Sequence, residues 1–76
     1  MNYIYKLTTT QKTDEAGVIH TVYGIEVHEV NADIPTRTVE DIFTDFSEAE
    51  HFVSACNMLH LDIEHLDDVI YDTLNA

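Results

Sequence analysis

Residues 37–59, RTVEDIFTDFSEAEHFVSACNML, decide the fold because their hydrophobic period changes along the stretch. Residues 37–43 fit the two-residue alternation of a strand, with Val39 and Phe43 on one face and Ile42 on the other. The apolar residues that follow recur three and four positions apart, which is the spacing of one helix face. The chain is therefore predicted to pass here from a sheet to a helical segment.

The helical segment carries signals for two helices. Ser47 and Glu50 form the S-x-x-E pattern of a capping box, which predicts a helix start at this point. The first helix has an apolar stripe of Ala49, Phe52, Val53, Cys56 and Leu59. Asp62 can cap a second helix, whose stripe comprises Ile63, Leu66, Val69, Ile70, Thr73 and Leu74.

Upstream of this stretch the pattern predicts two long strands. Residues 3–12 and 18–30 alternate in the manner of strands, and the turn between them contains Asp14 and Gly17. Gly24 interrupts the second strand and indicates a bulge or a close backbone approach. One sheet face is apolar and is expected to carry Tyr3, Tyr5, Leu7, Tyr23, Ile25 and Val27.

These elements predict an α+β fold in a single domain, residues 1–76: a three-stranded antiparallel sheet with two C-terminal helices packed on one face, β-β-β-α-α. The helices should cover the apolar face. The other face mixes Ile4, Val22 and Ile42 with Lys6, His20, Glu26 and His28. It can stay hydrated, or it can join a partner. A homodimer would form through this uncovered face or through an edge strand.

The charge excludes several partners. Fifteen acidic residues oppose three basic ones, and the formal net charge is −12. We therefore expect no direct binding to nucleic acid and no docking on anionic membranes, because both depend on Lys and Arg. The three basic residues, Lys6, Lys12 and Arg37, all precede position 38, so the acidic helical half is expected to lack cations with which to pair.

The second helix has an acidic face opposite its apolar stripe. Such a face is either solvated or a partner-binding surface. It is not a pocket that would desolvate one carboxylate for acid–base catalysis. The face consists of Glu64, Asp67, Asp68 and Asp72.

Metal binding and nucleophilic chemistry have candidate residues at His51, Cys56, His60 and His65. Their spacing lacks the tight pairs of zinc sites, and helical geometry does not bring them together. Cys56 lies on an apolar stripe in acidic surroundings, which favours a buried structural thiol over a nucleophile. We expect no metal, no cofactor and no enzymatic activity.

Several short segments resemble a known family: Tyr23-Gly24-Ile25, residues 41–45, Cys56-Asn57, and His65-Leu66 with Asp68-Val69. Over nearly its whole length the chain is similar to short clostridial gut proteins grouped as a domain of unknown function. The resemblance implies a bacterial, cytoplasmic protein and supplies no activity. Family members often carry Pro where this chain has Ile63. The lone cysteine and the lack of a signal-peptide pattern also predict a cytoplasmic location.

Two functions remain open at this point. The first is a small acidic, non-enzymatic binding or regulatory module that recognises another protein. The alternative is an acidic mimic of nucleic acid that inhibits a DNA- or RNA-binding protein, as phage inhibitors do. A mimic should bind its target with steep salt dependence, whereas an ordinary module should bind through an apolar patch with weak salt dependence.

Overall fold

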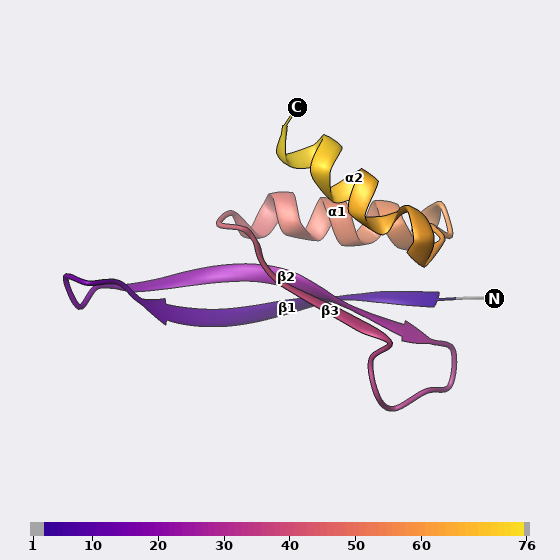
Figure 1. Ribbon diagram of the computed structural model, residues 1–76, viewed down its shortest axis with the longest axis horizontal. Coiled ribbons are helices and arrows are strands. Elements are labelled where there is room, and N and C mark those ends of the chain that lie inside the picture. The colour runs from indigo at the N-terminus through magenta and orange to yellow at the C-terminus, as the bar shows by residue number, and fades with distance from the viewer. Residues whose placement is uncertain (1–2, 76) are drawn as a thin grey trace.

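The computed structural model describes residues 3–75 and has the predicted α+β order. Strands β1 (Tyr3–Thr13), β2 (Ile19–Glu29) and β3 (Arg37–Phe43) form an antiparallel sheet in the order β1-β2-β3. The helical half comprises α1 (Phe46–Met58), the 3-10 turn η1 (Ile63–His65) and α2 (Leu66–Leu74). The helices lie on one side of the sheet (Figure 1).

The β1–β2 hairpin is longer than the rest of the sheet. Its strands pair along their whole lengths, from Tyr3 opposite Glu29 to Thr13 opposite Ile19. Strand β3 pairs with β2 only between Tyr23 and Val27. The half of the hairpin near its turn therefore projects beyond β3 and the helices (Figure 1).

The predicted irregularity at Gly24 is confirmed and takes the form of a bulge on β3. Tyr23 pairs with Phe43 and Ile25 pairs with Val39. An advance of two residues along β2 therefore lies opposite an advance of four residues along β3. A Cβ atom at Gly24 would lie 2.2 Å from the carbonyl oxygen of Val39, and only glycine permits that approach.

The bulge also changes which side chains of β3 face the helices. Asp41 takes a positive φ of 59° inside it, and the alternation of the strand is lost. Ile42 and Phe43 are consecutive, yet both lie in the core. The expectation that Ile42 would face the opposite side of the sheet is therefore wrong.

The core lies between the sheet and α1, on the predicted face. Tyr5, Ile25 and Val27 are buried there, and Tyr3, Leu7 and Tyr23 pack around them. The other buried members are Ile42, Phe43, Ala49, Phe52, Cys56 and Leu66. The rings of Phe43 and Phe52 meet with centroids 5.4 Å apart and join β3 to α1.

Helix α2 packs on this core through its first half, from Leu66 to Ile70. Leu66 is fully buried, Val69 and Ile70 are half-buried, and Leu74 is exposed. In Figure 1, α2 rises away from the sheet toward the C-terminus. The apolar stripe predicted for the second helix therefore covers the sheet at one end only.

The caps of both helices differ from the predicted ones. Asp45 is the N-cap of α1, and its Oδ2 accepts a hydrogen bond from the Glu48 amide at 3.2 Å. The capping box predicted at Ser47 is therefore wrong by two residues, although Asp45 and Glu48 have the same spacing. Asp62 occupies the N-cap position of η1 without a side-chain cap bond. It does not cap α2 directly.

Candidate functional site

A groove of about 720 Å³ opens where α2 diverges from α1. We call it the α1–α2 groove, and it runs between α1, the last turn of α2 and the end of β3. It is lined by Ile42, Phe43, Thr44, Glu48, His51, Phe52, Ala55, Thr73 and Leu74.

The groove arises because two faces of α1 have different surroundings. The face with Ala49 and Cys56 is buried against the sheet. The neighbouring face carries Glu48, His51 and Ala55 at helical spacing and borders the groove, while Phe52 belongs to both. On the opposite wall Leu74 is 55% exposed. The groove is therefore a hollow of mixed polar and apolar lining, whose α2 wall is incompletely packed.

The ionisable side chains that line the groove are Glu48 and His51, and both are exposed. Within residues 3–75 no Lys or Arg lines it. Two of the three basic residues are paired elsewhere: Lys12 contacts Asp41 at 3.0 Å, and Arg37 contacts Asp67. The carboxylate of Glu48 therefore supplies negative charge at the edge of the groove, and we call this edge the acidic rim.

These ion pairs correct one expectation about the acidic half. Its carboxylates were predicted to lack cations, but β1 and β3 bring Lys12 and Arg37 to them. The hydrogen bond from Arg37 lowers the pKa of Asp67 below its ordinary value, and the same contact raises the pKa of Arg37. Arg37 thereby links the start of β3 to the first turn of α2.

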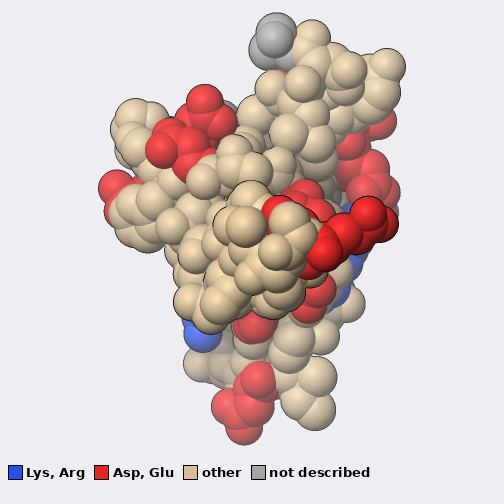
Figure 2. Space-filling model, turned by 90° about the vertical axis from the view of Figure 1, so that its left-hand side faces the viewer, with Lys and Arg blue, Asp and Glu red and all other residues tan. Residues whose placement is uncertain are grey.

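The predicted acidic face is not a uniform surface. Asp67 is paired with Arg37, whereas Asp68 and Asp72 are exposed on α2. Glu64 borders a smaller hollow of about 270 Å³ with Tyr3, Asp62 and Ile63. In Figure 2 acidic side chains lie in several separate places, with other residues between them. One of the four carboxylates is therefore held in an ion pair, and another lines a hollow.

Cys56 is buried, as predicted. Its side chain is one of the core residues at 4% exposure, and desolvation raises the pKa of its thiol to about 11. Among residues 3–75 no group of three His, Cys, Asp or Glu side chains is placed to hold a metal ion. The left-handed backbone of His60, with φ of 51°, instead marks the turn after α1.

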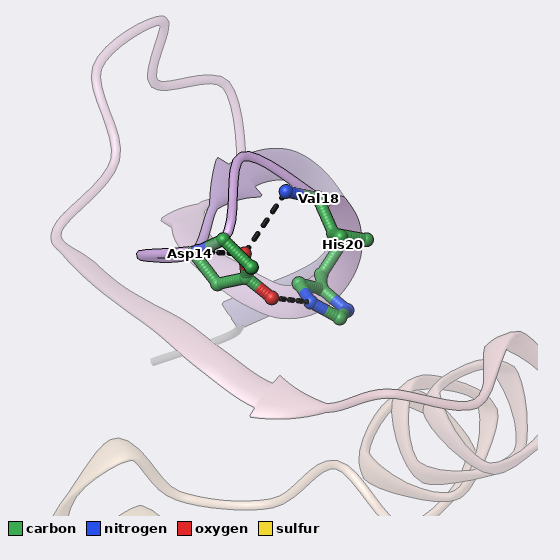
Figure 3. A network of polar contacts seen from close by, with 4 residues as sticks. Asp14, Val18 and His20 are labelled. Atoms are coloured by element: carbon green, nitrogen blue, oxygen red, sulfur yellow. Dashed lines mark hydrogen bonds and ion pairs between the residues drawn. The ribbon is translucent and has the colours of Figure 1, made fainter.

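A polar network closes the β1–β2 hairpin (Figure 3). Asp14 Oδ1 accepts hydrogen bonds from the backbone amides of Ala16 and Val18, both at 2.9 Å. Its Oδ2 lies 2.8 Å from His20 Nε2. The bond with His20 is the main cause of the lowered pKa of Asp14. This cluster holds a turn, as the sequence predicted for Asp14, and His20 adds a second anchor to it.

The sheet face away from the helices is partly closed by its own side chains. Val22 and His28 are buried there without any covering element, whereas Ile4 is 41% exposed. His28 Nε2 lies 3.0 Å from Glu26 Oε1, and its Nδ1 has no hydrogen-bond partner within the described part of the chain. This face thus offers less open apolar surface than its sequence suggests.

Sequence reasoning did not find the α1–α2 groove. The sequence pattern places Leu74 on an apolar stripe, makes His51 a candidate only for metal binding or nucleophilic chemistry, and assigns Glu48 to no site. One feature of the sequence is consistent with an incompletely packed end of α2. The last turn of this helix contains Asp72 and no basic residue, although the helix dipole favours a positive charge there.

Comparisons with family models, with curated proteins and with solved structures find no match for this chain. The resemblance to the clostridial family therefore stays a prediction. No helix within residues 3–75 is long and apolar enough to cross a membrane.

Proposed function

We propose that this protein is a small, non-enzymatic module that binds another protein through the α1–α2 groove. One observation carries the proposal: the apolar stripe of α2 leaves the core after Ile70, and Leu74 is exposed beside a hollow lined by Phe43 and Phe52. A groove between helices that combines apolar and polar side chains can bind a segment of a partner protein. Exposed apolar surface with a polar rim is typical of such sites.

The groove has few of the features that catalysis requires. Its carboxylate and imidazole, Glu48 and His51, are both exposed to water, whereas acid–base catalysis takes place in a pocket that excludes water. The thiol of Cys56 lies in the core and has a raised pKa, which leaves little thiolate at neutral pH. These features favour recognition over chemistry.

The nucleic-acid mimic receives less support than the protein-binding module. A mimic must present carboxylates in a spacing that imitates phosphates along a basic groove. Asp67 is instead bonded to Arg37, which neutralises one carboxylate of the predicted acidic face. The net charge of −12 is the feature that favours it.

Site-specific photo-crosslinking in the source cell tests the proposal. A photoreactive residue is placed at Leu74 in the groove and, as the matched control, at Met58, which is 78% exposed and lies outside the groove. We expect one discrete protein adduct from position 74 that is absent from position 58. Identical adducts from both positions, or none from position 74, would contradict the proposal.

A further inference from the structure

We infer that the segment bound in the α1–α2 groove is a cationic amphipathic helix of the partner protein. Its apolar side chains would pack on Ala55 and Leu74, beside the edges of the buried Phe43 and Phe52 rings, and its Lys and Arg residues would face the acidic rim. This inference rests on the proposed function and adds the charge and the secondary structure of the partner.

The charge of the occupant follows from the electrostatics of the groove. Glu48 lines the groove, and no Lys or Arg within residues 3–75 does so. Lys12 and Arg37 are held in ion pairs with Asp41 and Asp67, outside the groove lining. An acidic segment would therefore meet like charge at the rim and across a molecule of net charge −12. A basic segment would be attracted and oriented by the same field.

The helical form of the bound segment follows from the irregular backbone of β3. This strand borders the groove, and an extended peptide would have to bind along its edge. The bulge opposite Gly24 and the positive φ of Asp41 break the regular row of amide and carbonyl groups that such an addition requires. A helix satisfies its own backbone hydrogen bonds and needs only a surface that accepts its side chains.

The length of the groove sets the size of the binding motif. The α1 wall runs from Glu48 to Ala55, which is about 10 Å along a helix axis. A partner helix crossing or following this wall would use roughly two turns, with apolar anchors at positions i, i+3, i+4 and i+7. Lys or Arg residues would flank these anchors.

Synthetic peptides provide a direct test. The probe has roughly four helical turns, with Leu at the anchor positions and Lys at most others. One control has the same composition in scrambled order, and another keeps the Leu positions but carries Glu in place of Lys. Binding is measured by calorimetry and mapped by amide chemical shifts in NMR spectra. We expect the probe to shift the amides around Thr44, His51 and Leu74.

The controls separate a helix site from simple charge attraction. We expect the scrambled peptide to bind at least about tenfold more weakly, because it lacks a continuous apolar face. Leu74→Lys should weaken probe binding by a similar factor, whereas Met58→Lys, with the same charge change on an exposed residue outside the groove, should change it little. Equal binding of the scrambled or Glu peptide, or shifts mapped elsewhere, would overturn the inference.

The crosslinking experiment distinguishes this failure from that of the proposed function. A discrete adduct from position 74 to a partner segment that is neither cationic nor helical would overturn the inference and leave the proposed function standing. Loss of both the adduct and probe binding would overturn both.

Discussion

The side-chain amide of Asn57 hydrogen-bonds both backbone groups of Tyr5. The Tyr5 amide donates to Asn57 Oδ1 at 2.8 Å, and Asn57 Nδ2 donates to the Tyr5 carbonyl oxygen at 2.9 Å. At Tyr5, the side chain of Asn57 thus makes the two backbone hydrogen bonds that a neighbouring strand would make on the free edge of β1. This contact occupies an amide and a carbonyl group that would otherwise be free to pair with another chain. The Tyr5 hydroxyl donates to the Leu61 carbonyl oxygen at 2.7 Å, and burial raises the pKa of Tyr5 to about 12.

Replacing Asn57 by Leu should destabilise the fold and expose the β1 edge. The substitution leaves both backbone groups of Tyr5 unpaired at a partly buried position, which costs on the order of 1–3 kcal/mol. Urea unfolding measures the loss, and light scattering measures self-association. Met58→Leu is the matched control, because Met58 is an exposed neighbour on the same helix. Equal stability of the two variants would show that the Asn57 contact contributes nothing.

Phe52→Ala should remove most of the stability of so small a domain. Phe52 is buried against Phe43 and joins α1 to the sheet, so we expect a loss of about 3–5 kcal/mol. Denaturant titration of the purified variant gives this value. His51→Ala, at the exposed neighbouring position, should change stability by less than about 0.5 kcal/mol. A loss below about 1 kcal/mol for Phe52→Ala would mean that the helices do not rest on this face.

The parts of the fold that follow local pattern could be predicted from the sequence. Strand alternation placed Tyr5, Ile25 and Val27 on the covered face, and helical spacing placed Phe52 and Cys56 against them. Gly24 marked the bulge, because a glycine weakens the interior of a strand and is typical of places where another backbone comes close. The burial of Ile42 could not be predicted from the sequence, because it depends on how many residues of β3 lie opposite Gly24.

The candidate site could not be predicted from the sequence, because it depends on how residues that are distant along the chain are arranged in space. Arg37 and Asp67 lie thirty positions apart, and no periodicity links them. The stripe of α2 has correct helical spacing as far as Leu74, so its pattern does not reveal that the helix leaves the core after Ile70. The direction of a helix relative to a sheet is a tertiary property, and the α1–α2 groove results from it.

The thiol of Cys56 should react slowly in the folded protein. Its burial and its pKa of about 11 keep the thiolate fraction small at pH 8. The rate of reaction with a disulfide reagent should increase at least about tenfold when the chain is unfolded in denaturant. A fall of one unit in the pKa of the thiol already raises the thiolate fraction by about that factor. The same reagent added to an unfolded peptide spanning α1 serves as the reference. Rapid labelling of the folded protein at pH 8 would contradict the buried position of the thiol.

The hairpin turn should loosen at acid pH. The folded state lowers the pKa of Asp14 below its ordinary value of 3.8, mainly through the bond with His20. The turn network therefore contributes stability above that pH and loses it as the pH falls through the lowered value. The protection factors of the Ala16 and Val18 amides, which compare observed with intrinsic exchange at each pH, should fall in that range and should be lower at all pH values in Asp14→Ala. Glu15→Gln, a change at the neighbouring residue, should leave both amides protected.

The two ends of α2 should respond oppositely to the same charge reversal. Asp67→Lys removes the contact with Arg37, sets two cations side by side and places a positive charge at the helix N-terminus, so the melting temperature should fall. Asp72→Lys places the same charge in the last turn, where the helix dipole favours it and the net charge of −12 is reduced, so the melting temperature should rise. Both shifts should shrink as a non-binding salt is raised from very low to moderate concentration, because exposed charges are screened over about 8–10 Å near physiological salt. Thermal melts of the two variants beside the wild type give the sign of each shift. A rise in melting temperature for both variants would mean that overall repulsion outweighs the Arg37 contact.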